Sequence, residues 1–130
     1  MAATTTATDT ITTLYDAFKR GDIQFILDRV APNAVWRQSK SLPWGGDYRG
    51  QQGAAEFFQK LGAAMDTVSL DVHENIEHGD EVYSFGTYTG RGKKSGKTGT
   101  AEWMFRWRVQ DGKVVSWVSY IDTAALVAAL

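Results

Sequence analysis

The chain has 130 residues, with no cysteine and only two histidines, His73 and His78. The absence of cysteine excludes disulfide bonds, thiolate catalysis and cysteine-ligated zinc. Two histidines do not favour a histidine-based metal site, and we expect no metal and no cofactor. The length suits one domain, because a chain of this size buries a core without crosslinks. We therefore expect a single domain over residues 1–130, with disorder over about residues 1–8.

Two further classes of partner lack support in the sequence. The formal net charge is -1, so there is no positive excess to attract nucleic acid or an anionic membrane. No apolar run reaches the ~20 residues that a bilayer-spanning helix needs. The N-terminal stretch MAATTTATDT has neither the basic start nor the apolar segment of a signal peptide, which predicts a cytoplasmic protein.

The order of the expected elements indicates the fold class. Apolar residues at helical spacing predict two N-terminal helices, the first ending at Gly21 and the second capped by Asp22. A strand over 33–39, a loop over 41–50 and a third helix over 51–65 follow, and then four strands and a closing helix capped by Asp122. This order predicts an α+β fold: a cone-shaped curved antiparallel sheet wrapped around three N-terminal and interposed helices, with a short C-terminal helix.

Aromatic residues are abundant, at 12% of the chain with five tryptophans. Strict alternation within WMFRWRVQDGKVVSWVSYID (103–122) and within NAVWRQS (33–39) places seven side chains on one surface of the sheet: Trp36, Gln38, Trp103, Phe105, Trp107, Trp117 and Ser119. That surface is either a packed core or the wall of a ligand cavity. Since buried indole N–H groups need hydrogen-bond partners, we favour the cavity.

Several stretches resemble the SnoaL-like branch of the superfamily that contains nuclear transport factor 2, ketosteroid isomerase and polyketide cyclases. The matching stretches are LYDAFKRGDIQFILDRVAPNAVW, PWGGDYRGQQGAAEFF, GTYTGRG and VQDGKVVSWVSYIDTAAL. Their order and spacing cover most of the chain from about Thr10 onward. The resemblance implies a cone-shaped α+β barrel whose helices line a deep apolar cavity. It also implies a homodimer formed through the outer face of the sheet.

The catalytic residues of these relatives are absent from the matching positions. In ketosteroid isomerases a helix tyrosine, an aspartate base and a second aspartate act together, and their positions fall on Leu14, Gln38 and about Trp103. Tyr15 is the neighbour of Leu14 but is expected on another face of the helix. The histidine and aspartate of SnoaL-type cyclases fall on Phe105 and Ser119. The resemblance therefore implies the cavity without the known catalytic groups.

We predict ten ligand contacts and one acid–base candidate. The ligand contacts are Trp36, Gln38, Trp44, Tyr83, Phe85, Trp103, Phe105, Trp107, Trp117 and Ser119. Glu74 alternates in step with Val72 and Ile76, which predicts that its side chain points to the same inward face of the strand. It is therefore the candidate general acid or base. Its alternative is a bulge near the strand end that turns it to solvent. The basic run Arg91 to Lys97 is a solvated turn in the simplest interpretation.

Two functional hypotheses follow from these patterns. The first is a homodimeric cavity protein that binds an apolar or ring-containing small molecule and could catalyse an isomerase, cyclase or hydratase reaction on an unassigned substrate. The second is a non-catalytic protein-interaction or dimerisation module. Its distinguishing feature would be an apolar patch on the outer face, around Met104, Val118 and Tyr120, without an accessible pocket.

Overall fold

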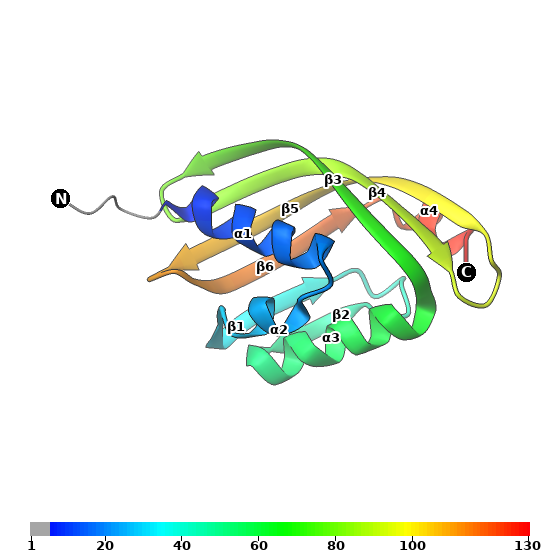
Figure 1. Cartoon of the computed structure of the whole chain (residues 1–130), viewed down its shortest axis with the longest axis horizontal. Coiled ribbons are helices and arrows are strands. Elements are labelled where there is room, and N and C mark those ends of the chain that lie inside the picture. The colour runs from blue at the N-terminus through cyan, green and yellow to red at the C-terminus, as the bar shows by residue number, and fades with distance from the viewer. Residues whose placement is uncertain (1–5) are drawn as a thin grey trace.

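The computed structural model describes residues 6–130, which form four helices and six strands (Figure 1). In chain order these are α1 (Ala7–Lys19), α2 (Ile23–Leu27), β1 (Val30–Gln38), β2 (Gly46–Arg49), α3 (Gly50–Ala64), β3 (Met65–His78), β4 (Glu81–Gly92), β5 (Thr98–Gln110), β6 (Lys113–Ile121) and α4 (Thr123–Val127). The α+β prediction is confirmed. The disorder expected over about residues 1–8 lies partly outside the described residues, but residues 7 and 8 already belong to α1.

Helix α1 begins earlier than its apolar pattern indicates because a capping box fixes its first turn. The Thr6 side chain accepts a hydrogen bond from the Asp9 backbone N–H, and the Asp9 carboxylate accepts one from the Thr6 N–H. The helix then buries Ile11, Leu14 and Ala17 against the sheet. Asp22 caps α2 and Asp122 caps α4, as predicted.

The six strands form one curved sheet in the order β2-β1-β6-β5-β4-β3. Neighbouring strands are antiparallel except for β1 and β6, which are parallel. Strand β2 lies in the segment expected to be a loop, and it pairs Tyr48 with Trp36. Helices α1, α2 and α3 lie against the concave face, and α4 packs against β5 near the C-terminus (Figure 1).

The concave face carries the aromatic side chains as the alternation predicts. Along β5, Trp103, Phe105, Trp107 and Val109 are buried, whereas Glu102, Arg106 and Arg108 point outward and are exposed. Cross-strand pairing places Trp36, Trp117 and Trp107 in one row, with Phe105 and Ser119 in the next. Small residues of β4 face the large residues of β5. Gly86 lies opposite Trp103, and a Cβ atom on Gly86 would come within 2.6 Å of the Trp103 indole.

Candidate functional site

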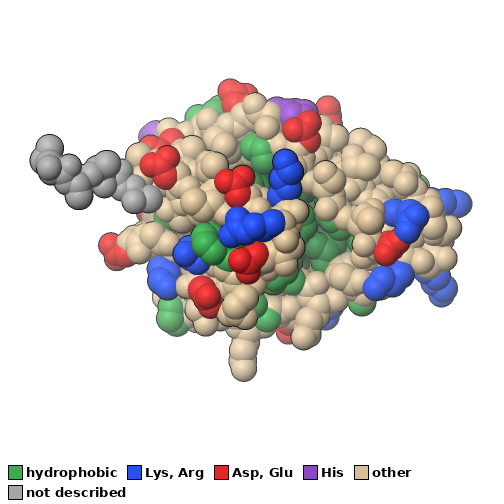
Figure 2. Space-filling model, in the orientation of Figure 1, with side chains coloured by type: hydrophobic (Ala, Val, Ile, Leu, Met, Phe, Trp, Pro, Cys, Tyr) green, Lys and Arg blue, Asp and Glu red, His purple; other side chains and the backbone are tan. Residues whose placement is uncertain are grey.

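A cavity lies between the concave face of the sheet and helices α1 and α3. Its volume is about 60 Å³, within about 610 Å³ of space free of protein atoms that includes open solvent. Its lining comes from α1, α2, α3, the β1–β2 loop and every strand except β2: Leu14, Tyr15, Phe18, Ile26, Trp36, Gln38, Trp44, Phe57, Phe58, Leu61, Val68, Leu70, Tyr88, Phe105, Trp107, Trp117 and Ile121. Figure 2 shows hydrophobic side chains within a hollow near the centre of the face that it displays.

The mouth of the cavity is bordered by apolar side chains that stay partly exposed. These are Phe18, Phe58, Val68, Leu70 and Ile121, all of intermediate exposure. Trp36 and Trp117 lie deeper, with exposures of 2% and 3%. Apolar surface therefore extends from the partly exposed residues to the buried rings, and each Å² of apolar surface removed from water contributes about 25 cal/mol.

Aromatic rings form the inner wall of the cavity and brace one another. Trp36 and Trp117 stack with ring centroids 4.6 Å apart, and Phe57 meets both of them edge-on at 5.9 and 5.2 Å. Phe105 meets Trp117 edge-on at 5.0 Å. These offset and edge-to-face arrangements are the favourable geometries for aromatic pairs. The wall is therefore preorganised by contacts among its own rings and does not need a ligand to hold its shape.

Two polar side chains of the lining already have protein partners. The Tyr15 hydroxyl accepts a hydrogen bond of 3.0 Å from Trp107 Nε1. Burial raises the pKa of the Tyr15 hydroxyl, and the nearby Ser84 and Trp107 side chains offset part of that rise. The Gln38 side chain is buried at 4% exposure, and its Oε1 accepts the backbone N–H of Ser39 at 2.9 Å. No hydrogen bond from the Gln38 amide NH₂ group to another described residue accompanies this contact.

Three buried polar atoms of the lining have no hydrogen-bond partner among residues 6–130. They are Trp36 Nε1, Trp117 Nε1 and the Tyr88 hydroxyl. Trp103 Nε1 and Ser119 Oγ are unpartnered too, but neither residue lines the cavity. Buried polar groups in folded proteins usually have partners, so leaving these three unpaired costs stability. They are covered by neighbouring atoms, and the surface that the cavity presents is almost wholly apolar.

The cavity is uncharged. Its described lining contains no Asp, Glu, His, Lys or Arg. Within the same part of the chain, no group of three or more acidic or histidine side chains could hold a metal ion. Because the lining has no carboxylate and no imidazole, it offers no such group for general acid–base catalysis.

No described helix is long and apolar enough to cross a bilayer.

For Glu74 the structure shows the stated alternative, a bulge that turns the side chain to solvent, and not the inward orientation of an acid–base candidate. A β-bulge between Val72 and Glu74 shifts the register of β3 against β4, and the Glu74 side chain is exposed. The bulge changes which face the residues beyond it present, so the parity shared with Val72 no longer applies to Glu74. Glu74 is absent from the cavity lining, which removes the one carboxylate that the sequence offered as an acid or base.

The predicted ligand contacts divide into three groups by their place in the structure. Six line the cavity: Trp36, Gln38, Trp44, Phe105, Trp107 and Trp117. Trp103 and Ser119 are buried but lie outside the lining. Trp103 lies across Gly86 and stacks on Phe105 at 4.0 Å. Tyr83 and Phe85 lie on the outer face opposite Arg106 and Met104, so the inward orientation expected of them is wrong.

Sequence reasoning missed Tyr15, Tyr88 and the α3 pair Phe57 and Phe58, all of which line the cavity. Tyr88 belongs to the even-numbered side of β4, with Val82, Ser84 and Gly86. The odd-numbered Tyr83 and Phe85 are more apolar than Ser84 and Gly86, which made them the obvious inward choice. The usable signal was complementarity of size, since the bulky Trp103 and Phe105 need small partners on the neighbouring strand.

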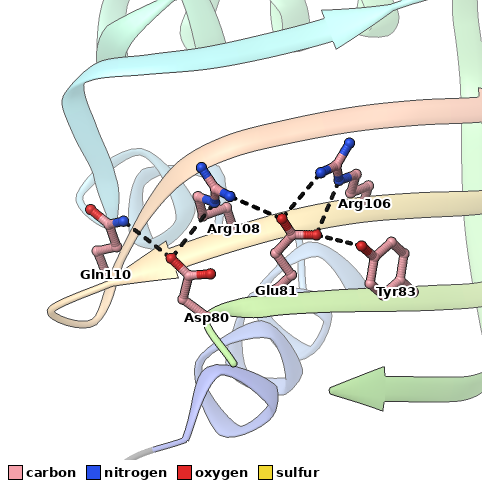
Figure 3. A network of polar contacts seen from close by, with 6 residues as sticks. All are labelled: Asp80, Glu81, Tyr83, Arg106, Arg108 and Gln110. Carbon is pink, nitrogen blue, oxygen red and sulfur yellow. Dashed lines mark hydrogen bonds and ion pairs between the residues drawn. The ribbon is translucent and has the colours of Figure 1, made fainter. Parts of the chain in front are cut away.

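The outer face of the sheet carries a charged network (Figure 3). Glu81 accepts hydrogen bonds from Arg106 at 3.1 and 3.2 Å, from Arg108 at 3.0 Å and from the Tyr83 hydroxyl. Asp80 accepts from Gln110 at 3.1 Å and pairs with Arg108 at 3.6 Å. The hydrogen bond from Arg106, followed by that from Tyr83, lowers the pKa of Glu81 to about 2. The network lies on the face opposite the cavity.

Fold and cavity together define an α+β protein with a cavity lined by aromatic side chains, and comparison with known proteins places it in a family. The sequence profile of the SnoaL-like domain matches residues 11–117, so the chain belongs to the SnoaL-like family. No curated protein matches it.

Solved structures agree with this assignment. An NTF2-like protein from Burkholderia xenovorans is 30% identical with a TM-score of 0.84, and the match covers 95% of this chain and 94% of that one. An NTF2-like protein from Burkholderia thailandensis is 26% identical with a TM-score of 0.89, covering 95% and 96%. TerC, co-crystallised with polyporic acid, is 28% identical with a TM-score of 0.86, also covering 95% and 96%.

Proposed function

We propose that this SnoaL-like protein binds an apolar, ring-containing small molecule in the cavity between α1, α3 and the sheet. The observation that carries the proposal is an uncharged cavity walled by interlocked aromatic rings and bordered by apolar side chains. Largely apolar concave sites with a few polar groups are the usual form of small-molecule sites. The similarity to TerC, whose structure was solved with polyporic acid, supports a ligand of this class.

A catalytic role of isomerase, cyclase or hydratase type is a narrower proposal, and the lining limits how it could work. Without a carboxylate or an imidazole in the cavity, catalysis would depend on orienting the substrate and on hydrogen bonds from hydroxyl and N–H groups. Binding is the function that the geometry supports directly. Any compound that binds should then be tested for conversion to a product.

The test of binding uses the tryptophans of the cavity wall. Polyporic acid, a steroid and a terpenoid are each titrated into the protein while its fluorescence is followed, and Trp117→Phe is compared with Trp103→Phe. Both residues are buried, with exposures of 3% and 4%, but only Trp117 lines the cavity. We expect saturable quenching whose affinity falls in Trp117→Phe and is retained in Trp103→Phe. If no compound gives a saturable response, the interaction-module hypothesis becomes the better one.

We also propose a homodimer formed through the outer face of the sheet. Apolar side chains occupy that face beside the charged network, including Tyr120 at 53% and Ile76 at 46% exposure. Met104 pairs with Tyr120 across β5 and β6. Light scattering of the wild-type protein and of Tyr120→Lys tests this, with a dimer expected for the first and a shift toward monomer for the second. A wild-type monomer would refute the dimer and leave the ligand proposal standing.

A further inference from the structure

The cavity, at the size it has in this structure, is too small for the ring compound proposed to bind there. Its volume is about 60 Å³, whereas an engineered apolar cavity that takes up benzene in another protein measures about 150 Å³. The aromatic wall on the sheet does not supply the difference, because Trp36, Trp117 and Phe57 pack against one another with ring centroids 4.6 to 5.9 Å apart. Some part of the helical side must therefore move before a ring compound can enter.

One aromatic pair of the lining joins helix α1 to helix α3. Phe18 is the last residue but one of α1, Phe58 lies within α3, and both line the cavity. Their ring centroids are 6.3 Å apart, with the planes inclined at 36°. Both side chains are partly exposed, whereas Phe57, the neighbour of Phe58, is buried at 4% exposure. Rotation toward solvent is therefore open to both rings of the pair.

Helix α1 is anchored to the sheet on the N-terminal side of Phe18. Thr8 donates its backbone N–H and its hydroxyl to Glu77, at 2.8 and 2.7 Å, and the Tyr15 hydroxyl is held by an indole N–H of β5 at 3.0 Å. Among residues 6–130, the α3 ring is the only aromatic partner of Phe18. The helix then ends, and Gly21 turns the chain at a φ of 75° where a Cβ atom would meet nothing within 4 Å. Phe18 thus lies at the loosely packed end of a helix whose other end is fixed.

From these contacts we infer that Phe18 and Phe58 form a gate, which is closed in this structure and which admits the ring compound when the two rings separate. The inference rests on the proposed function and specifies how its site is reached. A single aromatic pair adds little beyond the burial of its area, and exposed side chains change rotamer rapidly, so the open form is accessible. Because the ligand enters only the open form, the rate of uptake scales with the fraction of protein in which the gate is open.

The first experiment measures the rate of uptake by stopped-flow fluorescence. The probe is N-phenyl-1-naphthylamine, an uncharged ring compound whose emission rises in apolar surroundings. Phe18→Ala is expected to speed uptake roughly three- to tenfold, because the aromatic pair no longer has to separate. Phe25→Ala is the matched control, since Phe25 in α2 is also partly exposed but does not line the cavity, and it should leave the rate unchanged. Uptake by Phe18→Ala at the wild-type rate would overturn the gate.

The second experiment locks the gate, which is possible because the chain has no cysteine of its own. In the double variant Phe18→Cys, Phe58→Cys, ethylene bismethanethiosulfonate joins the two introduced thiols. We expect the joined protein to exclude the probe, and to take it up again once dithiothreitol has cleaved the link. Protein loaded with probe before joining should retain it through gel filtration. Methyl methanethiosulfonate modifies both thiols without joining them, so it provides the control in which uptake continues.

The outcomes distinguish the gate from the proposed function. If the joined protein takes up the probe as fast as the protein treated with methyl methanethiosulfonate, the gate is overturned and the proposed function survives, because binding is still observed. If wild-type protein and Phe18→Ala bind neither the probe nor polyporic acid, both are overturned. Exclusion by the joined protein with recovery after reduction supports both.

Discussion

Trp107 Nε1 on β5 donates a hydrogen bond of 3.0 Å to the Tyr15 hydroxyl on α1, joining residues 92 positions apart in the chain. The two rings also meet edge-on, with centroids 5.9 Å apart at 89°. This contact ties the first helix to the centre of the aromatic sheet and positions one wall of the cavity. It satisfies the only cavity-lining indole N–H on β5, so its removal has a defined consequence.

Tyr15→Phe is expected to destabilise the protein by about 1–2 kcal/mol, because the buried Trp107 N–H loses its partner. Tyr88→Phe removes a hydroxyl that has no partner, so it should leave the free energy of unfolding unchanged or raise it. Urea denaturation of the two variants provides the comparison. Equal losses in both would contradict the assignment of a paired and an unpaired hydroxyl.

Much of the fold could be predicted from the sequence because apolar periodicity reports directly on burial. The helices at the N-terminus, the aromatic side of β5 and the caps at Asp22 and Asp122 all follow from local patterns. The parallel pairing of β1 with β6 could not be predicted in this way, since Trp36 and Trp117 meet only after distant segments assemble. Strand β2 has four residues and little pattern of its own.

The cavity was predictable on β1, β5 and β6 but not on β3 and β4. Two local features defeated the parity argument there. The bulge between Val72 and Glu74 shifts the register of β3 against β4, and the residue types around it do not fix its position. On β4 the inward residues Ser84 and Gly86 are small because the partner side chains are large, so hydrophobicity pointed to the wrong side. Tyr88 lies on the same inward side of β4 as Ser84 and Gly86, so the same argument wrongly placed it on the outer face.

The stability of the protein should fall steeply in alkaline solution because of Tyr15 and Tyr88. Burial raises the pKa of both hydroxyls above the ordinary value of about 10. Above that pH the unfolded chain loses these protons while the folded protein keeps them, so stability is fully present below pH ~10 and declines as the pH rises. Each tyrosine contributes a slope of at most about 1.4 kcal/mol per pH unit.

Urea denaturation between about pH 9 and 11 measures this decline, and Tyr88→Phe should reduce its slope. Absorbance of tyrosinate at the same pH values gives an independent check. Folded protein should show less tyrosinate than the fully unfolded chain, whose five tyrosines are all free to ionise. A folded protein that titrates like the unfolded chain would refute the assignment.

Glu81 should contribute stability that is lost in acid. Its pKa falls from about 4.5 to about 2 through hydrogen bonds from Arg106 and Tyr83. A carboxylate with a lowered folded-state pKa stabilises the protein above its unfolded pKa, and that contribution disappears as the pH falls through the folded value. Glu81→Gln should therefore lower the melting temperature at neutral pH, and its difference from wild type should shrink between about pH 4.5 and 2. Thermal melts across this range test it, and a difference independent of pH would contradict the ion-pair explanation.

Two glycines with opposite surroundings test how tightly the aromatic wall is packed. At Gly86 a Cβ atom would press on the Trp103 indole at 2.6 Å and on the Asp71 backbone oxygen, whereas at Gly62 in α3 it would meet nothing within 4 Å. Gly86→Ala should destabilise the protein by about 1–3 kcal/mol through overpacking. Gly62→Ala should stabilise it by about 0.5–1 kcal/mol, because alanine loses less backbone entropy in a helix than glycine does. Urea denaturation measures both variants. A neutral Gly86→Ala would mean that Trp103 does not lie against β4, and the size complementarity inferred for β4 and β5 would then be wrong.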